Sequence, residues 1–154
     1  MRRIVLALAA ALIGCAKVTP PGPPVPHSAM DVSASFGRTW DAAIDQMTQR
    51  TLPIKTIERV SGLIATDVLT ADSTHWTEAD CGKDLDRVAF VPSHATFNVL
   101  VRGDSAHSTV RVTVRWMSVG LNESKRVISV ICSTRGVWET RLENQIKEVA
   151  ERRR

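Results

Sequence analysis

Two neighbouring stretches of strict alternation constrain the fold more than any other feature of the sequence. Residues 95–102 and 109–116 place an apolar side chain at every second position, and Gly103-Asp104-Ser105 follows the first stretch. Successive residues of a strand point to opposite faces, so the pattern predicts two antiparallel strands, each with one apolar face. The inward set is Ala95, Phe97, Val99, Val101, Val110, Val112, Val114 and Trp116. A sheet with one covered face is therefore expected at the centre of the fold.

Three further segments have the composition of strands. Residues 54–60 and 63–69 flank Ser61-Gly62, which predicts a hairpin, and residues 127–131 follow a loop over 120–125. The sequence thus predicts about five strands, mostly antiparallel.

Two amphipathic helices enclose these strands in the sequence. Residues 35–51 carry one apolar stripe, which Ser33 or Ser35 can cap and Pro53 terminates. A second stripe follows Ser133 and Thr134, either of which can cap it. The stripes consist of Phe36, Trp40, Ala43, Ile44 and Met47, and of Val137, Trp138, Leu142, Ile146 and Val149.

The second helix also places Glu143 four residues before Lys147, which predicts a surface ion pair. The order helix, strands, helix predicts an α+β two-layer sandwich. With 154 residues in all, one domain over 31–150 is expected, followed by a basic tail at 151–154.

The first fourteen residues are typical of a secretory signal. Arg2 and Arg3 precede an uncharged apolar run from Ile4 to Ile13, too short to span a bilayer. The run ends in Leu12-Ile13-Gly14-Cys15, which resembles the lipobox of bacterial lipoproteins. That resemblance implies cleavage before Cys15 and lipidation of its thiol, and several acyl chains on one residue anchor a protein stably. The alternative is an ordinary cleaved signal with a chance cysteine.

The residue after the cysteine bears on the destination. Residue 16 is alanine and not the aspartate that favours inner-membrane retention in proteobacterial lipoproteins. By resemblance we therefore expect the protein to be anchored at the periplasmic face of the outer membrane. Removal of Arg2 and Arg3 lowers the formal net charge from +4 to +2, so the basic balance comes partly from the signal. We therefore expect no nucleic-acid partner.

A proline-rich stretch separates the signal from the domain. Residues 19–26 hold five of the seven prolines, a composition that favours extended polyproline II over helix or sheet. At about 3.1 Å per residue, eight residues reach roughly 25 Å. Residues 15–30 are therefore interpreted as a lipidated N-terminus and tether that spaces the domain from the membrane. A PxxP ligand for a partner protein is the alternative.

Two cysteines remain once Cys15 carries lipid. Cys81 lies in the long polar segment 70–92, and Cys132 closes the last strand. An even count in an oxidising compartment favours a disulfide over two free thiols. A zinc site is a third alternative, because His75 lies six residues before Cys81, but no CxxC or HxxxH spacing supports it.

The sequence lacks the recognisable patterns of enzymes. It contains no GxSxG, HExxH or phosphate-cradling glycine-rich loop, and its four histidines (His27, His75, His94 and His107) pair with no nucleophile in a known order. The acidic cluster Glu78, Asp80, Asp84 and Asp86 is interleaved with Lys83 and Arg87, as in a solvated loop. We therefore expect no catalytic residue, metal or cofactor. Trp76 is either a cap over the core or a contact residue for a partner.

The domain resembles a family of envelope lipoproteins with a helix-grip-like fold, represented by the accessory lipoprotein BamC of the outer-membrane β-barrel assembly machinery. Phe36, Arg38 and Trp40 at the start of the first helix carry the resemblance, together with Ser61-Gly62-Leu63-Ile64 in the hairpin. It spans roughly residues 35–150. The anchor, the tether and the absence of catalytic patterns lead us to expect a non-enzymatic outer-membrane lipoprotein whose domain binds envelope protein, as an interaction or assembly module.

Two other functions remain open at this point. A helix-grip-like fold can hold a small molecule or glycan between helix and sheet, and an envelope hydrolase is a third hypothesis. A cavity beneath the second helix favours the ligand binder, whereas a filled sheet face with an exposed apolar patch favours the interaction module.

Overall fold

The two alternating segments form the longest strands of the sheet. In the computed structural model, which describes residues 19–83, 90–121 and 127–152, they are β6 (His94–Gly103) and β7 (Ser108–Leu121). The strands are antiparallel and pair without interruption from His94 opposite Met117 to Gly103 opposite Ser108. The residues expected to face inward are the buried ones on both strands.

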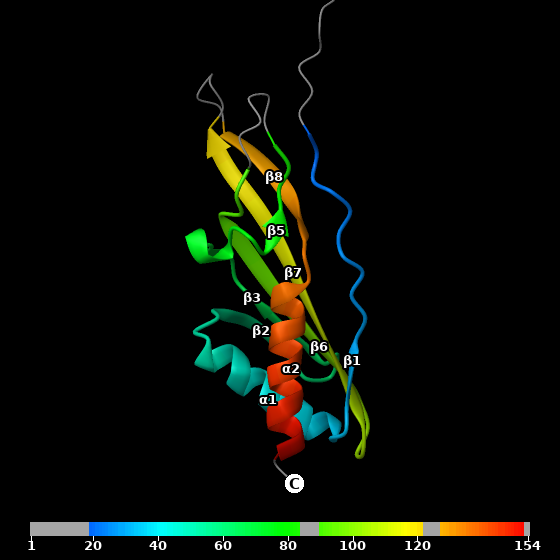
Figure 1. The fold of residues 1–154 in the computed structure, drawn as a ribbon. Helices are drawn as coiled ribbons and strands as arrows, with labels where there is room; N and C mark the ends of the chain where they lie inside the picture. The colour runs from blue at the N-terminus through cyan, green and yellow to red at the C-terminus, as the bar shows by residue number, and fades with distance from the viewer. Residues whose placement is uncertain (1–18, 84–89, 122–126, 153–154) are drawn as a thin grey trace, which may run out of the picture.

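The remaining strands complete an open antiparallel sheet of eight strands (Figure 1). The main order is β2-β3-β6-β7-β8-β5, while β1 pairs with β7 and β4 with β6. Their bounds are β1 Met30–Val32, β2 Ile54–Glu58, β3 Leu63–Thr66, β4 Leu69–Thr70, β5 Ala79–Asp80 and β8 Val127–Thr134. The prediction of five strands was too low, because β1, β4 and β5 are too short to show alternation.

Both expected helices are present. Helix α1 (Phe36–Gln49) begins at Ser35, whose hydroxyl accepts a hydrogen bond from the Arg38 amide, and it ends well before Pro53. Helix α2 (Val137–Arg152) follows Gly136. The Thr134 hydroxyl lies 3.1 Å from the Gly136 amide nitrogen and 2.7 Å from a carboxylate oxygen of Glu139, so it links the last strand to the first turn of α2.

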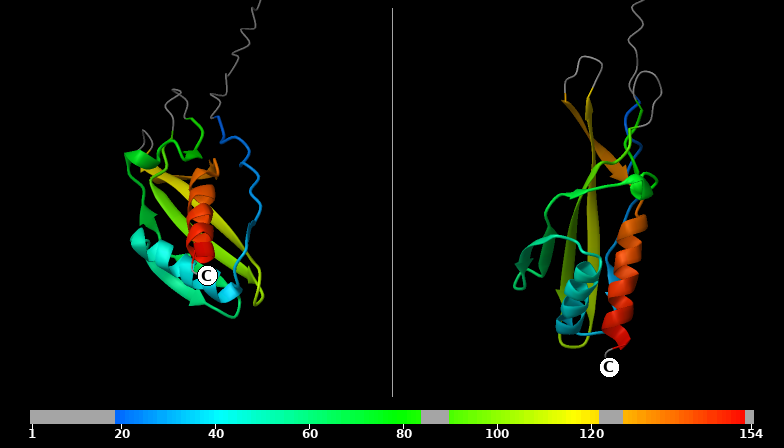
Figure 2. Two further views of the ribbon diagram at one scale, coloured as in Figure 1. Left: turned by 60° about the horizontal axis from the view of Figure 1, so that its bottom comes forward. Right: turned by 90° about the vertical axis from the view of Figure 1, so that its left-hand side faces the viewer.

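The helices cover one face of the sheet and leave the other open (Figure 2). Trp40 and Met47 of α1, and Leu142 and Ile146 of α2, are buried against the inward residues of β6 and β7. The two helices also contact each other. The α+β two-layer architecture predicted from the sequence is therefore confirmed.

The surface ion pair expected on α2 is absent, because Glu143 is completely buried. Its Oε1 accepts a hydrogen bond of 2.7 Å from the Val112 amide of β7 and lies 2.7 Å from Nε2 of His27. Lys147 instead donates to the carbonyl of Asp31 at 2.9 Å. The β1 ladder pairs with β7 only as far as Val110, so the Glu143 carboxylate supplies the acceptor that a longer β1 would have provided.

The proline-rich stretch lies along the domain instead of projecting from it. Residues 19–29 run beside α2 and β8 into β1, as the blue segment of Figure 1 shows. The Thr19 amide donates to the Lys83 carbonyl at 3.2 Å and the Lys83 amide to the Thr19 carbonyl at 2.9 Å. A Cβ at Gly82, whose φ is +77°, would lie 2.3 Å from the Thr19 carbonyl oxygen, so glycine permits this close approach. Over residues 19–29 the stretch is therefore part of the folded unit.

Candidate functional site

The predicted disulfide is formed. Cys81, just after β5, is bonded to Cys132 of β8, and both residues are buried. The bridge holds the segment after β5 against the junction between the sheet and α2. Cys15, the predicted lipidation site, lies outside the described residues.

Two members of the acidic cluster, Glu78 and Asp80, lie among the described residues. Asp80 accepts hydrogen bonds from the amides of Gly22 and Gly82, both at 2.9 Å, and these bonds lower the pKa of its carboxyl below the usual range. Glu78 is buried and lies 3.9 Å from the Arg141 guanidinium. Asp84 and Asp86 lie outside the described residues. Asp80 therefore holds the N-terminal segment on the domain.

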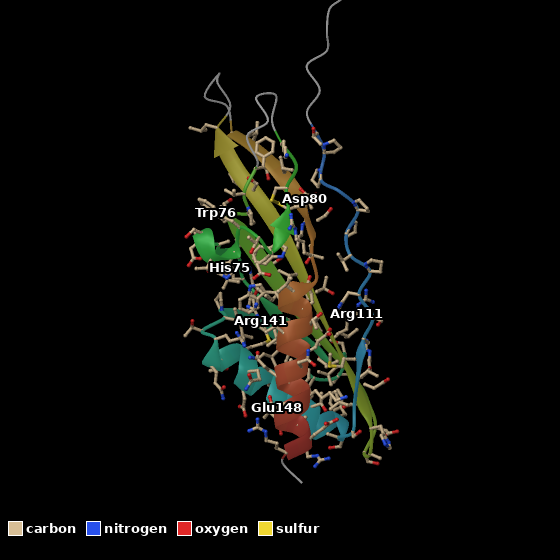
Figure 3. The ribbon with its side chains drawn as sticks, in the orientation of Figure 1. His75, Trp76, Asp80, Arg111, Arg141 and Glu148 are labelled. Carbon is tan, nitrogen blue, oxygen red and sulfur yellow. A yellow bond between two sulfur atoms is a disulfide. The ribbon has the colours of Figure 1, made fainter. Side chains whose placement is uncertain are left out.

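Trp76 follows the short 3-10 helix η1 (Ser73–His75) and is 52% exposed. That exposure excludes a role as a cap over the core. In Figure 3 it lies on the side of the molecule away from the N-terminal segment. A role as a contact residue for a partner stays a prediction.

A cavity of about 140 Å³ lies between η1, the start of α2 and the sheet. Most of its wall is apolar: Leu52, Leu69, Ala71, Ala95 and Phe97. Arg50, Thr70, His75, Trp116 and Trp138 complete the lining. The volume is below the range of about 300–1,000 Å³ typical of drug-sized ligands, but it is close to the roughly 150 Å³ of a cavity that holds benzene.

Aromatic rings and arginines from distant segments meet at this cavity. The His75 ring stacks on Trp138, with centroids 5.7 Å apart and an interplanar angle of 20°. The guanidinium carbons of Arg50 and Arg141 lie 5.2 and 5.6 Å from the centre of the same indole ring. Burial, and secondarily the charge of Arg141, lower the pKa of Arg50. The site thus places two cations close together around one aromatic ring.

Two residues in the lining of the cavity carry a buried nitrogen donor without an acceptor among the described residues. These donors are the indole nitrogen of Trp116, a residue that is 1% exposed, and Nε of Arg50. An unpaired buried donor costs free energy. The pattern of the sequence revealed neither donor as part of a site, because Trp116 matches a core position and Arg50 closes a helix.

The open face of the sheet is a second candidate site. Leu63, Asn98, Leu100, Arg111 and Thr113 line a groove of about 330 Å³ on it. Arg111 lies directly opposite Leu100, and Arg115 opposite Thr96, on the face that the helices leave bare. Within the described ranges, no carboxylate forms an ion pair with Arg111 or Arg115. Glu58 on β2 and Asp31 on β1 lie toward the margins of this face.

The other predicted positions are distributed over the surface. His94 lies at the start of β6, where its Nδ1 is 2.9 Å from the Ser93 hydroxyl, and His107 lies exposed in the β6–β7 turn. No group of three histidines, cysteines or carboxylates suited to a metal ion occurs in the part of the chain that the structure describes. Neither of the two described helices is long and apolar enough to cross a membrane.

Comparisons with known proteins add no family to this description. No protein-family model matches the sequence, and no curated protein matches it.

Proposed function

We propose that this protein is a lipid-anchored envelope lipoprotein without enzymatic activity, whose open sheet face binds an acidic segment of a partner protein. In this proposal Cys15 carries the lipid at the periplasmic face of the outer membrane, as its lipobox-like context suggests. The resemblance to BamC-like helix-grip domains supports a role in assembly and belongs to the same proposal.

The observation that carries the proposal is the composition of the open face. Arg111 and Arg115, which form no ion pair with the described residues, project from the same strand, and Leu63 and Leu100 lie beside Arg111 in the groove. A polypeptide with acidic and apolar side chains complements such a face in both charge and hydrophobicity. Arginine also gives specific paired hydrogen bonds to carboxylates.

Site-specific photocrosslinking in cells tests this face. A photoreactive phenylalanine at Leu100 should yield a discrete adduct with one envelope protein, and the crosslinked peptide should contain acidic residues. The same amino acid at Asn144, which is exposed on α2, is the matched control and should give no such adduct. Arg111→Glu should abolish the Leu100 adduct while leaving the protein folded, because Arg111 is exposed.

Two outcomes would contradict the proposal. An adduct that forms equally from Asn144 would show that the open face is not selective. An adduct from Leu100 that survives Arg111→Glu and Arg115→Glu together would show that charge complementarity does not recruit the partner.

The cavity favours a second function, the binding of a small organic acid. Arg50 supplies a cation in the lining, and the aromatic wall fits a ring of about the size of benzene. Benzoate is therefore a suitable probe. It should quench the intrinsic tryptophan fluorescence saturably, and Arg50→Gln should weaken that binding. A fluorescence signal that stays linear in benzoate, or that Arg50→Gln leaves unchanged, would exclude this function.

A further inference from the structure

The docked N-terminal segment determines which end of the domain lies near the anchor. Thr19 is paired with Lys83 at one end of the molecule, and only three residues separate it from Cys15. Four residue steps of extended chain span at most about 14 Å. A lipid on Cys15 would therefore hold this end of the domain close to the bilayer, and the proline-rich stretch would not lift it away.

The same end of the molecule carries the ends of β7 and β8 (Figures 1 and 2). Here β7 and β8 together expose four large apolar side chains, and two of them form a cross-strand pair. Leu121 and Val127 face each other and are 66% and 71% exposed. Val119 is 39% exposed and Ile131 58%. We call these four residues the hairpin tip.

We propose that the hairpin tip rests on the membrane surface, with Leu121 and Val127 inserted among the lipid headgroups and upper acyl chains. The proposal rests on the lipid anchor at Cys15 that the proposed function assigns. It adds a second contact with the membrane and a defined orientation, in which the β6–β7 turn and the C-terminal end of α2 point away from the bilayer.

Two observations favour lipid over a protein as the occupant. The hairpin tip lies at the end of the domain where Thr19 connects to Cys15. A lipid on Cys15 would therefore bring a bilayer to the tip without any further partner. Exposed Lys83 lies at the same end, where a cation is attracted to anionic phospholipid. Two inserted aliphatic side chains add to the affinity of a lipid-anchored protein through the apolar area that they bury.

The opposite end of the domain supplies a matched control. Val60, in the β2–β3 turn, is 95% exposed. That turn lies beside the far end of β6, because the amide of Val101 donates to the carbonyl of Gly62 at 2.8 Å. Leu121 lies thirteen residues along β7 from Ser108, or about 43 Å at the usual rise of a strand. A probe at Val60 should therefore be far from the bilayer.

The experiment uses the full lipidated protein in vesicles of phosphatidylethanolamine and phosphatidylglycerol. With Cys15 acylated and Cys81 bonded to Cys132, a cysteine introduced as Leu121→Cys or Val60→Cys is the one reactive thiol. Each is labelled with the environment-sensitive fluorophore NBD. We expect the emission at position 121 to shift to shorter wavelength and to be quenched by lipids with spin labels near the headgroup. The probe at position 60 should show neither effect.

Each remaining outcome overturns the inference. Identical emission and no lipid quenching at both positions would place the tip in water. A blue-shifted emission at position 121 without lipid quenching would show that protein, such as a second copy of this chain, covers the tip. A purified protein that lacks acyl chains and does not float with the vesicles would overturn the anchor itself, and the tip inference with it.

Discussion

Glu143 provides a sharp test of how the domain holds its N-terminal segment. Its buried carboxylate is the acceptor for the Val112 amide and contacts His27, so Glu143→Ala leaves a buried amide without a partner. An unsatisfied buried donor costs about 1–3 kcal/mol. We expect Glu143→Ala to lower the free energy of unfolding by at least that amount. Glu143→Gln keeps an oxygen acceptor and should lie within about 1 kcal/mol of wild type.

The assay is urea denaturation at neutral pH with the disulfide intact. Glu148→Ala is the matched control, since Glu148 is an exposed residue of the same helix that pairs with Arg152 (Figure 3). Its substitution should change stability by no more than about 0.5 kcal/mol. If Glu143→Ala and Glu148→Ala had the same midpoint, the carboxylate would not satisfy the Val112 amide and the reasoning would fail.

The same residue predicts a dependence of stability on pH. Burial raises the pKa of Glu143, and nearby Glu139 adds to the effect, while the Val112 amide and His27 oppose it. The folded state then binds the proton more readily than the unfolded chain, whose glutamate pKa is about 4.3. The stabilisation that comes from protonating Glu143 is complete below the unfolded pKa and is lost as pH rises through the pKa of Glu143 in the folded state. Wild type should therefore gain stability relative to Glu143→Gln on acidification across this window, and parallel pH profiles would contradict the assignment.

Three further predictions concern the core, the disulfide and a turn. Trp40→Ala should lower the free energy of unfolding by about 3–5 kcal/mol, because Trp40 is 2% exposed. Trp76→Ala should lower it by at most about 1 kcal/mol, because Trp76 is half-exposed. Equal urea midpoints for the two variants would refute the packing of the helices on the sheet. Replacing Cys81 and Cys132 by alanine should cost about 4 kcal/mol, because the bridge closes a loop with a sequence separation of 51; an unchanged midpoint would contradict this. Gly62→Ala should lower the free energy of unfolding by more than about 1 kcal/mol, because φ is +65° and the new Cβ would lie 2.1 Å from the Val101 carbonyl oxygen. If the variant unfolded at the same temperature as wild type, the predicted strain would be disproved.

The sequence predicted the elements that repeat a pattern over several residues. Alternation in β6 and β7 and the stripes of both helices reflect burial on one side, so they identified most of the core and the α+β class; Val137, predicted in the stripe of α2, is instead 41% exposed. The parity of the cysteines identified the Cys81–Cys132 bridge. These features depend on residue type and spacing alone.

What the sequence did not reveal depends on contacts between distant segments. Strands of two or three residues, such as β1 and β5, carry no periodicity. In the sequence, Glu143 matches an exposed position of a helix. It is a buried acceptor because the pairing of β1 with β7 stops at Val110 and leaves the Val112 amide to the Glu143 carboxylate. The cavity likewise needs Arg50, His75 and Trp138 to converge from three elements.

The anchor at Cys15 supports both the proposed function and the orientation of the hairpin tip, so its chemistry is the most direct test. The measurement is mass spectrometry of the N-terminal peptide of the protein purified from membranes. We predict that this peptide begins at Cys15 and carries a diacylglyceryl group and an amide-linked acyl chain. A peptide that begins at another residue, or an unmodified Cys15, would contradict the account.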